Sequence, residues 1–431
     1  MLDIRLIREE TAAVEGALKA RGETLSVRPI LELDQRRRQL LREAEELKAE
    51  RNRVSEAIGQ AKRRGENPEA EMVRMREAGE RIKTLDARVK ETDAELELLL
   101  LQLPNVLHPS VPPGLTEEEN VEVRRWGTPR AFSFPPKPHE EVGETLGLLD
   151  LERAVKLAKS RFAVMWGAVA RLERALAQLM LDLHAREHGY TELWVPHLVS
   201  GTTMLQTGQL PKFDEQLFKT IEADENRTLY LIPTAEVPLT AMHGGEILLE
   251  ETLPRRYTAF TPCYRREAGT YGKDMKGIYR QHQFDKVELV KITMPGQSYD
   301  ELESMVADAE DVLRRLEIPF RTVLHCAGDT GPNAAKSYDI EVWRPPQGKY
   351  TEISSCSNCE AFQARRLDLK YRPAGGGKVD YCHTLNGSGL AVGRTLIAVL
   401  ENYQEADGSV SIPKALQPYM GGQERITPVA K

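Results

Sequence analysis

A heptad pattern between residues 30 and 103 constrains the fold more than any other part of the sequence. Its apolar positions in the first stretch are Leu33, Leu40, Leu47, Val54 and Ala61, with Ile30, Ala44 and Ile58 between them. Those in the second stretch are Ala78, Ile82, Leu85, Val89, Thr92, Leu96, Leu99 and Leu103. A break at Gly65-Glu66-Asn67-Pro68 separates the two. Such repeats predict an antiparallel helical hairpin, a coiled coil whose arms of about 35 residues project about 50 Å.

The first arm of this hairpin carries clusters of cations. Six of them are candidates for contact with nucleic acid: Arg36, Arg37, Arg51, Arg53, Lys62 and Arg63. Arg37 and Arg51 occupy seam positions, where a packing helix prefers an apolar residue. Cations on a long, thin arm suit a phosphate backbone, which is bound electrostatically. A spacer or dimerisation coiled coil would show the same heptads, so the arm alone leaves both roles open.

The rest of the chain predicts a second domain. Proline-rich Pro104–Pro113 and acidic Glu117–Glu119 indicate a linker over residues 104–131, between an N-terminal domain (1–103) and a globular domain (132–431). Residues 1–27 indicate one short helix and a connector. The globular domain begins with a long helix, Arg161–His188, and a strand, Tyr190–Val195. Later strands are expected at Arg227–Ile232, Arg256–Tyr264, Gln281–Ile292, Ser337–Val342 and Thr351–Ser354. Because turns rather than helical crossovers join these strands, we expect an α+β fold with an antiparallel sheet flanked by helices.

Composition excludes several classes of protein. The net charge of −7 does not indicate a general nucleic-acid binder, although a local basic surface remains compatible with it. No apolar run approaches the ~20 residues of a membrane span, so no membrane partner is expected. Five cysteines in 431 residues make no disulfide framework, and the charged N-terminus is not a secretory signal. A reducing, cytoplasmic setting fits best.

The stretch Thr261–Val290 reads as a strand, a long polar loop and a second strand. Its loop is punctuated by the glycines Gly269, Gly272 and Gly277. Alternation along the second strand places Phe284, Lys286 and Glu288 on one face, with Phe284 and Glu288 roughly 13 Å apart. Arg265 on the facing strand adds a planar cation suited to phosphate or carboxylate. The stretch predicts either a slot for an elongated ligand with a base, a phosphate and a polar head, or an ordinary hairpin with a charged solvent face.

Two strand ends offer hydrogen-bond acceptors. In Pro233-Thr234-Ala235-Glu236, a hydroxyl and a carboxylate could accept hydrogen bonds from an ammonium group, or could cap a helix. In Glu352-Ile353-Ser354-Ser355, the carboxylate and hydroxyl oxygens suit Mg²⁺. Cys356 and Cys359 follow directly, but without a second pair at this spacing no zinc site is expected.

A glycine-rich stretch, Gly387–Arg394, leads into an apolar helical segment. Its glycines permit close backbone approach, and Arg394 stands near a helix start, where anions are favoured. Taken alone this signal is weak.

In this order, the stretches resemble the three motifs of class II aminoacyl-tRNA synthetases. The strand ending at Pro196 corresponds to motif 1, Arg265–Glu288 to motif 2 and Gly387–Arg394 to motif 3. The similarity to bacterial-type seryl-tRNA synthetases extends over the whole chain. It includes the segments TGQLPKF at Thr207–Phe213, PTAEVPLT at Pro233–Thr240, HQFDKVE at His282–Glu288, TEISSCSNCEAFQARR at Thr351–Arg366 and LNGSGLAVGR at Leu385–Arg394.

The resemblance implies an ATP-dependent ligase that attaches L-serine to tRNA(Ser) through a seryl-adenylate, and it leaves open whether tRNA(Sec) is also charged. It implies a homodimer with motif 1 at the interface, and a hairpin that binds the long variable arm of the tRNA. Two alternatives are less compatible with the sequence. A paralogue that activates an amino acid for a carrier protein typically lacks the hairpin. A non-catalytic RNA-binding homologue would be expected to lose Arg265, Glu267, Glu352 or Arg394, and all four are present.

The resemblance also implies residue roles. Arg265, Glu352 and Arg394 are the expected catalytic residues. Arg265 would hold the α-phosphate and the serine carboxylate, Glu267 the adenine amino group, and Phe284 with Arg394 the adenine ring. Glu352 and Ser355 would hold Mg²⁺ on the phosphates. The expected ATP-binding set is completed by Arg266, Ile353 and Ser354. Serine would be read by Thr234, Ala235, Glu236, Arg265, Glu288, Asn386 and Ser388. Glu288 is the expected acceptor for the serine hydroxyl, because a pocket that pairs this hydroxyl can reject analogues lacking it.

Overall fold

The structure, a computed structural model, describes residues 1–224, 227–268 and 276–429. Gly269 and Gly272 of the expected polar loop lie outside the described residues. The chain forms two compact units: Met1–Lys19 with Glu23–Pro104, and Ala20–Gly22 with Asn105–Lys431. Among the described residues, no helix is long and apolar enough to cross a membrane.

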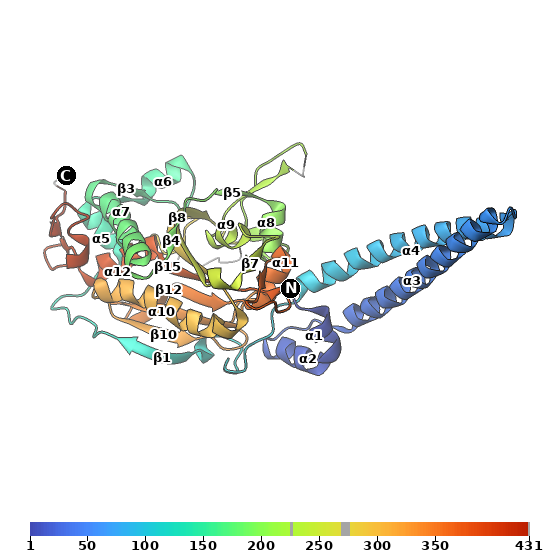
Figure 1. The fold of residues 1–431 in the computed structure, drawn as a ribbon. Helices are drawn as coiled ribbons and strands as arrows, with labels where there is room; N and C mark the ends of the chain where they lie inside the picture. Colours follow the sequence, from blue (N-terminus) through green and yellow to red (C-terminus); the bar gives the residue numbers. More distant parts are fainter. Residues whose placement is uncertain (225–226, 269–275, 430–431) are drawn as a thin grey trace. The chain divides into compact units, whose positions relative to one another are not determined.

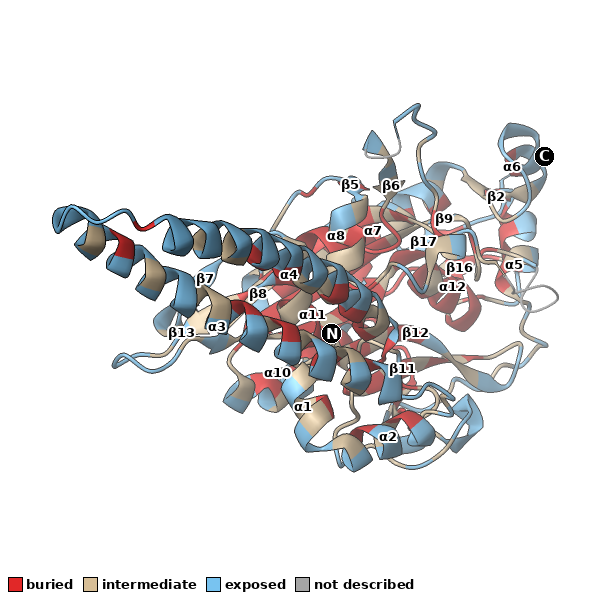
Figure 2. Ribbon diagram, turned by 90° about the vertical axis from the view of Figure 1, so that its right-hand side faces the viewer, coloured by how far each residue is buried: buried red, intermediate tan, exposed pale blue. Residues whose placement is uncertain are grey.

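The first unit contains the helical hairpin that the heptads predict (Figure 1). α3 (Arg28–Arg63) and α4 (Glu69–Gln102) are its arms, and buried positions recur along both helices (Figure 2). Leu40, Ala44 and Leu85 form the centre of the seam. Two short helices precede the hairpin, α1 (Ile4–Glu9) and α2 (Thr11–Ala20), so the expectation of a single short helix was wrong.

The hairpin seam includes ion pairs as well as apolar contacts. Arg37, at a seam position, pairs with Asp93 of the opposite arm, and Lys48 pairs with Asp86 at 2.9 Å. Asp34 is buried and pairs with Arg38 at 3.0 Å. Opposite charges thus take the place of apolar side chains at part of the seam.

The second unit is built on an eight-stranded sheet with the order β1-β10-β11-β12-β15-β9-β8-β4. Its strands are β1 (Val121–Trp126), β4 (Thr191–Glu192), β8 (Arg255–Tyr264), β9 (Gln283–Thr293), β10 (Phe320–Leu324), β11 (Lys336–Arg344), β12 (Lys349–Asn358) and β15 (His383–Ala391). Every neighbouring pair is antiparallel except β4 with β8, which is parallel. The predicted α+β fold with a mainly antiparallel sheet is confirmed.

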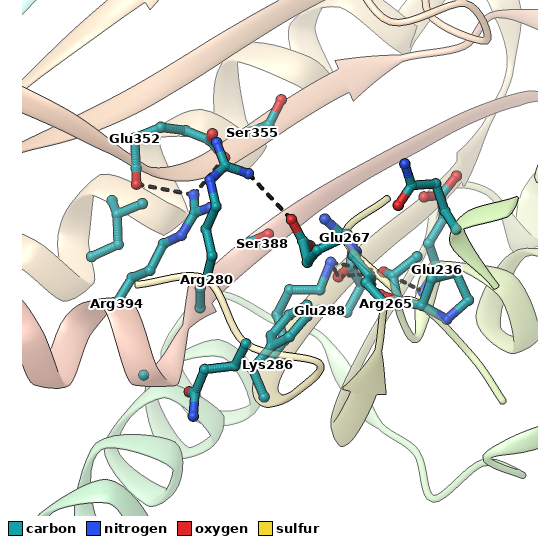
Figure 3. A pocket seen from close by; sticks show the side chains of 18 of the residues that line it. Glu236, Arg265, Glu267, Arg280, Lys286, Glu288, Glu352, Ser355, Ser388 and Arg394 are labelled. Carbon is teal, nitrogen blue, oxygen red and sulfur yellow. Dashed lines mark hydrogen bonds and ion pairs between the residues drawn. The ribbon is translucent and has the colours of Figure 1, made fainter. Parts of the chain in front are cut away.

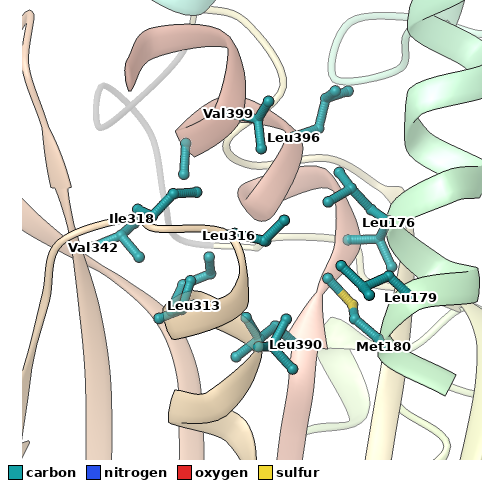
Figure 4. Packing of buried hydrophobic residues seen from close by; sticks show 14 of the residues in the cluster. Leu176, Leu179, Met180, Leu313, Leu316, Ile318, Val342, Leu390, Leu396 and Val399 are labelled. Carbon is teal, nitrogen blue, oxygen red and sulfur yellow. The ribbon is translucent and has the colours of Figure 1, made fainter. Parts of the chain in front are cut away.

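Three longer helices share one apolar core with this sheet. They are α7 (Gly167–Asp182), α10 (Ser298–Arg315) and α12 (Val392–Asn402). Figure 4 shows side chains from the three helices meeting those of β11 and β15: Leu176, Leu179 and Met180 of α7, Leu313 of α10, Val342 of β11, Leu390 of β15, and Leu396 and Val399 of α12. α7 and α10 are apolar on the side that faces this core and more polar elsewhere, as surface helices are, whereas α12 is buried on all sides except at Arg394.

Smaller elements surround the sheet. The helices are α5 (His139–Leu146), α6 (Leu151–Leu157), α8 (Gly201–Gln206), α9 (Glu236–Ala241) and α11 (Ala361–Leu367), and a π-helical turn (Leu183–Glu187) extends α7. The strands are β2 (Leu149–Asp150), β3 (Val164–Met165), β5 (Leu198–Ser200), β6 (Leu229–Leu231), β7 (Ile247–Leu249), β13 (Lys370–Arg372), β14 (Asp380–Tyr381), β16 (Val410–Ser411) and β17 (Arg425–Ile426).

Several expected boundaries differ from the structure. The helix expected over Arg161–His188 begins only at Gly167, because residues 164–165 pair with β2 as the strand β3. The strand expected at Tyr190–Val195 is reduced to Thr191–Glu192. β1 lies inside the expected linker and pairs with β10 at the edge of the sheet. Val121 and Val123 alternate with polar residues, but both valines are exposed, so this short alternation marks no buried face.

Candidate active site

A cavity of about 520 Å³ lies over the middle of the sheet (Figure 3). Its lining side chains come from three neighbouring strands, β12, β15 and β9, from the start of α12, and from loops that include the segment after β8. This volume is within the range of ordinary small-molecule sites. The expected site residues that line it are Thr234, Glu236, Arg265, Glu267, Phe284, Glu288, Glu352, Ile353, Ser355, Asn386, Ser388 and Arg394.

β9 supplies the floor of the cavity. Phe284, Lys286 and Glu288 all line it, as their alternation along the strand predicts. Glu288 stands directly opposite Ser388 of β15, and therefore on the same face of the sheet. Because β9 is hydrogen-bonded to β8 on one side and to β15 on the other, its register is fixed from both sides.

One end of the cavity is acidic. Lys286 forms an ion pair with Glu288, and both side chains are almost completely buried. The Thr234 hydroxyl donates to Glu288 Oε2 at 2.9 Å and accepts from Lys286 Nζ at 2.8 Å. It also accepts from the backbone N–H of Glu236 at 3.2 Å, at the start of α9. Thr234 therefore has two roles, because it caps the start of α9 and contacts Glu288.

Glu236 is the second carboxyl at this end. Its burial and the negative charge of Glu288 raise the pKa of Glu236 to about 7. Two amides donate to its Oε1, Gln363 Nε2 at 2.7 Å and Asn386 Nδ2 at 3.2 Å. Two acids beside one lysine make this end suited to a small ligand that carries a positive charge.

The middle of the cavity carries arginines. Arg265 follows β8, donates from Nε to the carbonyl of Pro233 at 3.2 Å and lies over the ring of Phe284, 5.3 Å from its centroid. Arg280 pairs with Glu267 at 3.4 Å, and its buried Nε has no hydrogen-bond partner among the described residues. Arg280 was not foreseen, because it stands in a loop where no periodicity assigns it a direction.

The other end combines oxygen ligands with Arg394. Glu352 and Ser355 are three residues apart, a spacing that would place them on opposite faces of a regular strand. A β-bulge at Ile353, where two residues of β12 oppose one of β11, resets the alternation, so both line the cavity. The segment was expected at a strand end, but β12 continues to Asn358.

Glu352 and Ser355 form a donor set that fits Mg²⁺. The ion prefers oxygen ligands and usually takes one or two protein groups together with phosphates. The positive charge of Arg394 lowers the pKa of Glu352, which keeps this carboxylate ionised. Behind them, partly buried Asp339 stands opposite Ser355 and pairs with His325 at 2.9 Å.

Arg394 lies in the first turn of α12, as expected. It pairs with the Glu352 carboxylate at 3.0 Å and lies 4.5 Å from the centroid of the Tyr279 ring. The Tyr279 hydroxyl in turn donates to the carbonyl of Glu352 at 3.3 Å. Tyr279, another residue that the sequence did not reveal, thus holds the guanidinium in a plane at the rim of the cavity.

The glycine-rich stretch is a strand rather than a turn. Gly387 and Gly389 belong to β15, and a Cβ on them would meet Cys356 Sγ at 2.7 Å and His184 Nε2 at 2.6 Å. These glycines therefore permit tight packing of β15 against its neighbours. This agrees with the expected close approach of the backbone, and the groups approached are the side chains of Cys356 and His184.

Among the described residues, three members of the expected ligand sets do not line the cavity: Arg266, Ala235 and Ser354. The side chain of Arg266 is exposed, and Ala235 is buried beneath α9. Ser354 points to the other side of β12, where its hydroxyl donates to the carbonyl of Ser388 at 2.6 Å. Cys356 and Cys359 are buried, and burial raises the pKa of the Cys356 thiol to about 12.

Eleven further lining residues had no assigned place in the expected site. They are Gln209, Phe213, Gln216, Leu217, Pro233, Ile278, Tyr279, Arg280, Gln281, Ala391 and Gly393. Lys286 was expected on the correct face but without a role. Most of the others come from loops, where the sequence offers no alternation to indicate which side chains turn inward.

On the hairpin, five of the six expected cations are exposed on α3: Arg36, Arg51, Arg53, Lys62 and Arg63. Arg37 is engaged with Asp93 across the seam. Except for Arg36, the exposed set lies in the half of α3 that adjoins the turn.

Comparisons with known proteins match both units. Residues 1–107 match the family described as "Seryl-tRNA synthetase N-terminal domain", and residues 218–403 match "tRNA synthetase class II core domain (G, H, P, S and T)". A curated relative from Nitratidesulfovibrio vulgaris, named serine–tRNA ligase, is 55% identical over 427 residues, which cover 99% of this chain and 100% of the relative.

Solved structures agree with these matches. A crystal structure of seryl-tRNA synthetase from Pyrococcus horikoshii, complexed with ATP, has a TM-score of 0.92 and 40% identity, with 100% of both chains covered. A cytoplasmic serine–tRNA ligase from Naegleria fowleri, in complex with AMP, has a TM-score of 0.88 and 30% identity, with 100% of this chain and 99% of the other covered.

Proposed function

The chain belongs to the seryl-tRNA synthetase family, and we propose that it attaches L-serine to tRNA(Ser) at the expense of ATP, by way of a seryl-adenylate. The observation that carries this proposal is the order of groups along one cavity. An aromatic ring (Phe284), a guanidinium (Arg265) and a pair of acids (Glu236 and Glu288) succeed one another, with an oxygen-rich face at Glu352. The adenine base, the phosphates, the metal ion and the amino acid would therefore each lie beside a side chain of suitable chemistry.

ATP is bound between Phe284, in the middle of the cavity, and Arg394, at the end that holds Glu352. The adenine ring stacks between them, because an aromatic face and a planar guanidinium both favour a π-system. Glu267 accepts the adenine amino group. Arg265 pairs with the α-phosphate. Arg280 adds a second guanidinium for the outer phosphates, because its buried Nε has no hydrogen-bond partner among the described residues. Of the other expected ATP ligands, Ile353 lines the cavity, whereas Arg266 and Ser354 lie away from it.

Mg²⁺ would be held by Glu352 and Ser355 together with the phosphates, and it would neutralise charge that develops there. In the described structure, Arg394 supplies the positive charge beside this carboxylate. Arg394 therefore keeps the Glu352 carboxylate ionised, which is the form that binds a metal ion.

Serine is bound at the acidic end. Its ammonium group pairs with Glu236, its carboxylate with Arg265, and its hydroxyl donates to Glu288. Ser388 and Asn386 close the pocket from β15, and Thr234 fixes Glu288 from the other side. Thr234 and Lys286 already hold Glu288 in place, and an analogue without the hydroxyl adds no hydrogen bond to this carboxylate.

The reaction needs positioning rather than a general base. The serine carboxylate is ionised at neutral pH, so one of its oxygens attacks the α-phosphorus directly. A new oxygen–phosphorus bond forms, the bond to the bridging oxygen breaks, and pyrophosphate leaves. The arginines hold the reacting groups in line and stabilise the added charge. A ribose hydroxyl of the tRNA terminus then attacks the seryl carbonyl carbon and releases its proton, the bond from this carbon to the phosphate oxygen breaks, and AMP leaves.

The hairpin is the proposed tRNA-binding arm. Exposed Arg36, Arg51, Arg53, Lys62 and Arg63 supply the phosphate contacts. The arm recognises a long variable arm by shape and charge, which would also admit tRNA(Sec) if that tRNA presents the same arm. Arg37 is less suited to this role because it is engaged with Asp93.

A homodimer and a cytoplasmic setting complete the proposal. The edge of the sheet at β4 is followed by Trp194, which is 87% exposed, and Phe260 of neighbouring β8 is also exposed. Large exposed aromatic residues beside a sheet edge favour burial against a second copy. Sedimentation or light scattering of the purified chain tests the dimer.

Serine-dependent exchange of radiolabel between pyrophosphate and ATP tests the activation step. We expect exchange with serine and little with alanine, threonine or glycine. A folded protein that shows no serine-dependent exchange would sink the proposal. Charging of tRNA(Ser) and tRNA(Sec) transcripts, measured separately, then tests the transfer step.

A further inference from the structure

Gln363 lies behind the acidic end of the cavity and makes three hydrogen bonds there. It belongs to α11 and is fully buried. Its Nε2 donates to the carbonyl of Thr207 at 3.1 Å and to Glu236 Oε1 at 2.7 Å, and its Oε1 accepts from the Thr384 hydroxyl at 2.6 Å. A fully buried amide whose donors and acceptor are satisfied adopts one orientation.

The orientation of this amide follows from its partners. The Thr207 carbonyl can only accept, so the nitrogen of Gln363 must face it. The oxygen of Gln363 therefore faces Thr384, whose hydroxyl donates to it. Thr207 and Thr384 are themselves fully buried, so neither exchanges its partner for water. Gln363 is thereby held as a fixed donor toward Glu236.

This donor decides which oxygen of Glu236 meets a ligand. Oε1 of Glu236 receives two N–H groups, from Gln363 and from Asn386 at 3.2 Å. An oxygen with two donors does not carry the carboxyl proton, so any proton, and any ammonium group, goes to Oε2. Glu236 lines the cavity, and the hydrogen bond from Gln363 fixes its rotation there.

We propose that Gln363 is a positioning residue for amino-acid binding, which orients Glu236 toward the substrate ammonium group. The inference rests on the proposed function, because it deepens the account of how that site binds serine. Gln363 is not among the described residues that line the cavity. Its effect must therefore pass through Glu236.

The effect of Gln363 can be measured through the pKa of Glu236, which depends on the charges around this carboxyl. Glu288 and Lys286 face it from β9, Arg265 from the end of β8 and the Cys359 thiol from beyond β12. Burial and Glu288 raise the pKa of Glu236 to about 7, whereas the hydrogen bond from Gln363 lowers it. Without that hydrogen bond the pKa rises further. Serine capture by the ionised form then begins at higher pH.

The test is Gln363→Met, which keeps the approximate shape of the side chain and removes both polar atoms. In pyrophosphate exchange we expect kcat/KM for serine to fall about 10- to 100-fold at pH 7, as for loss of a hydrogen bond to a charged group. KM for ATP should change less than about twofold, because Glu236 is the only one of the three hydrogen-bond partners of Gln363 that lines the cavity. The rising limb of kcat/KM for serine against pH should move to higher pH. Gln347→Met, at an exposed glutamine between β11 and β12, is the matched control.

Thr384→Val provides a second variant, since it keeps Gln363 but removes the donor that fixes its oxygen. We expect the same shift of the pH limb, smaller in size. It also carries the test if Gln363→Met does not fold. An unchanged pH limb in a folded variant, or an equal loss for serine and ATP, would overturn the inference. Absence of serine-dependent exchange in the wild-type chain is a different result, which overturns the proposed function and this inference with it.

Discussion

Lys286 and Glu288 form an ion pair within the floor of the cavity, where only 7% and 2% of these residues are exposed. Thr234 completes the arrangement by contacting both side chains. The proposed serine acceptor is therefore part of a desolvated charge pair, so its contributions to binding and to stability cannot be removed separately by one substitution.

Glu288→Ala is expected to abolish serine-dependent exchange and to lower the free energy of unfolding by about 3–5 kcal/mol, because Lys286 is left as an uncompensated buried charge. The double variant Lys286→Met with Glu288→Leu should recover much of the stability but none of the activity. Urea unfolding and pyrophosphate exchange measure the two effects. If Glu288→Ala still selects serine over alanine, another residue reads the hydroxyl.

Glu352→Gln is expected to raise the Mg²⁺ concentration for half-maximal exchange about 10-fold or more, since even outer partners of a metal ligand contribute that much to affinity. Binding of Mn²⁺ in the presence of ATP, followed by electron paramagnetic resonance, gives a readout independent of turnover. Glu251→Gln, at an exposed position, serves as the control. An unaltered metal requirement in Glu352→Gln would place the ion elsewhere.

Replacement of residues 30–103 by a short Gly/Ser linker should leave serine-dependent exchange intact and abolish tRNA charging, because the cavity is built from the second unit alone. Unchanged charging would make the hairpin a spacer. This variant separates the two steps of the proposed reaction.

Lys62→Ala with Arg63→Ala tests the cations at the hairpin turn. If both side chains bind phosphates, the slope of log affinity for tRNA against log salt concentration becomes shallower by about 0.7–0.9 for each cation removed. Arg37→Met should act differently, by loosening the seam where it pairs with Asp93. Its expected effect is a lower melting temperature of the hairpin at an almost unchanged salt slope.

A buried ion pair away from the cavity makes a prediction about pH. Arg344 donates to both oxygens of Glu401, at 2.5 and 2.8 Å, and both residues are buried. Although burial opposes ionisation, the hydrogen bonds from Arg344 and His139 hold the pKa of Glu401 below its usual value. A depressed carboxyl pKa contributes stability that is present above the unfolded value of about 4.3 and is lost as pH falls through the folded value.

Arg344→Met should therefore lower the free energy of unfolding by about 3–5 kcal/mol at pH 7. The difference from the wild type should shrink below about pH 4, as Glu401 becomes protonated. Urea titrations at several pH values measure it. Arg130→Met, which removes a more exposed pair with Glu405, should cost less than about 1 kcal/mol. Equal effects of the two variants would contradict this account.

Periodic parts of the fold could be predicted from the sequence, and irregular parts could not. The heptads predicted both hairpin arms, and alternation placed Phe284, Lys286 and Glu288 on one face. Glu352 and Ser355 line the same site only because of the bulge at Ile353, and the spacing of residues in the sequence does not reveal such a bulge. Arg280 and Tyr279 stand outside any repeat, so their directions depend on tertiary contacts.

Two other differences have the same physical origin. β1 is exposed on both faces, so its place in the sheet depends on backbone pairing with β10 rather than on an apolar pattern. The glycines of β15 resembled a turn, yet their small size serves packing against Cys356 and His184. In both cases the neighbour across the sheet decides the local structure.

The pairing of β9 on both sides also limits how this protein can change length during evolution. One inserted residue between Lys286 and Glu288 would turn Phe284 and Lys286 to the opposite face, and the pairing of β9 with β8 from Gln283 to Ile292 contains no bulge that absorbs an extra residue. The neighbouring strands β12 and β15 have already accommodated extra residues as bulges. Homologous chains should therefore differ in length at the hairpin turn, and keep a fixed spacing between Phe284 and Glu288.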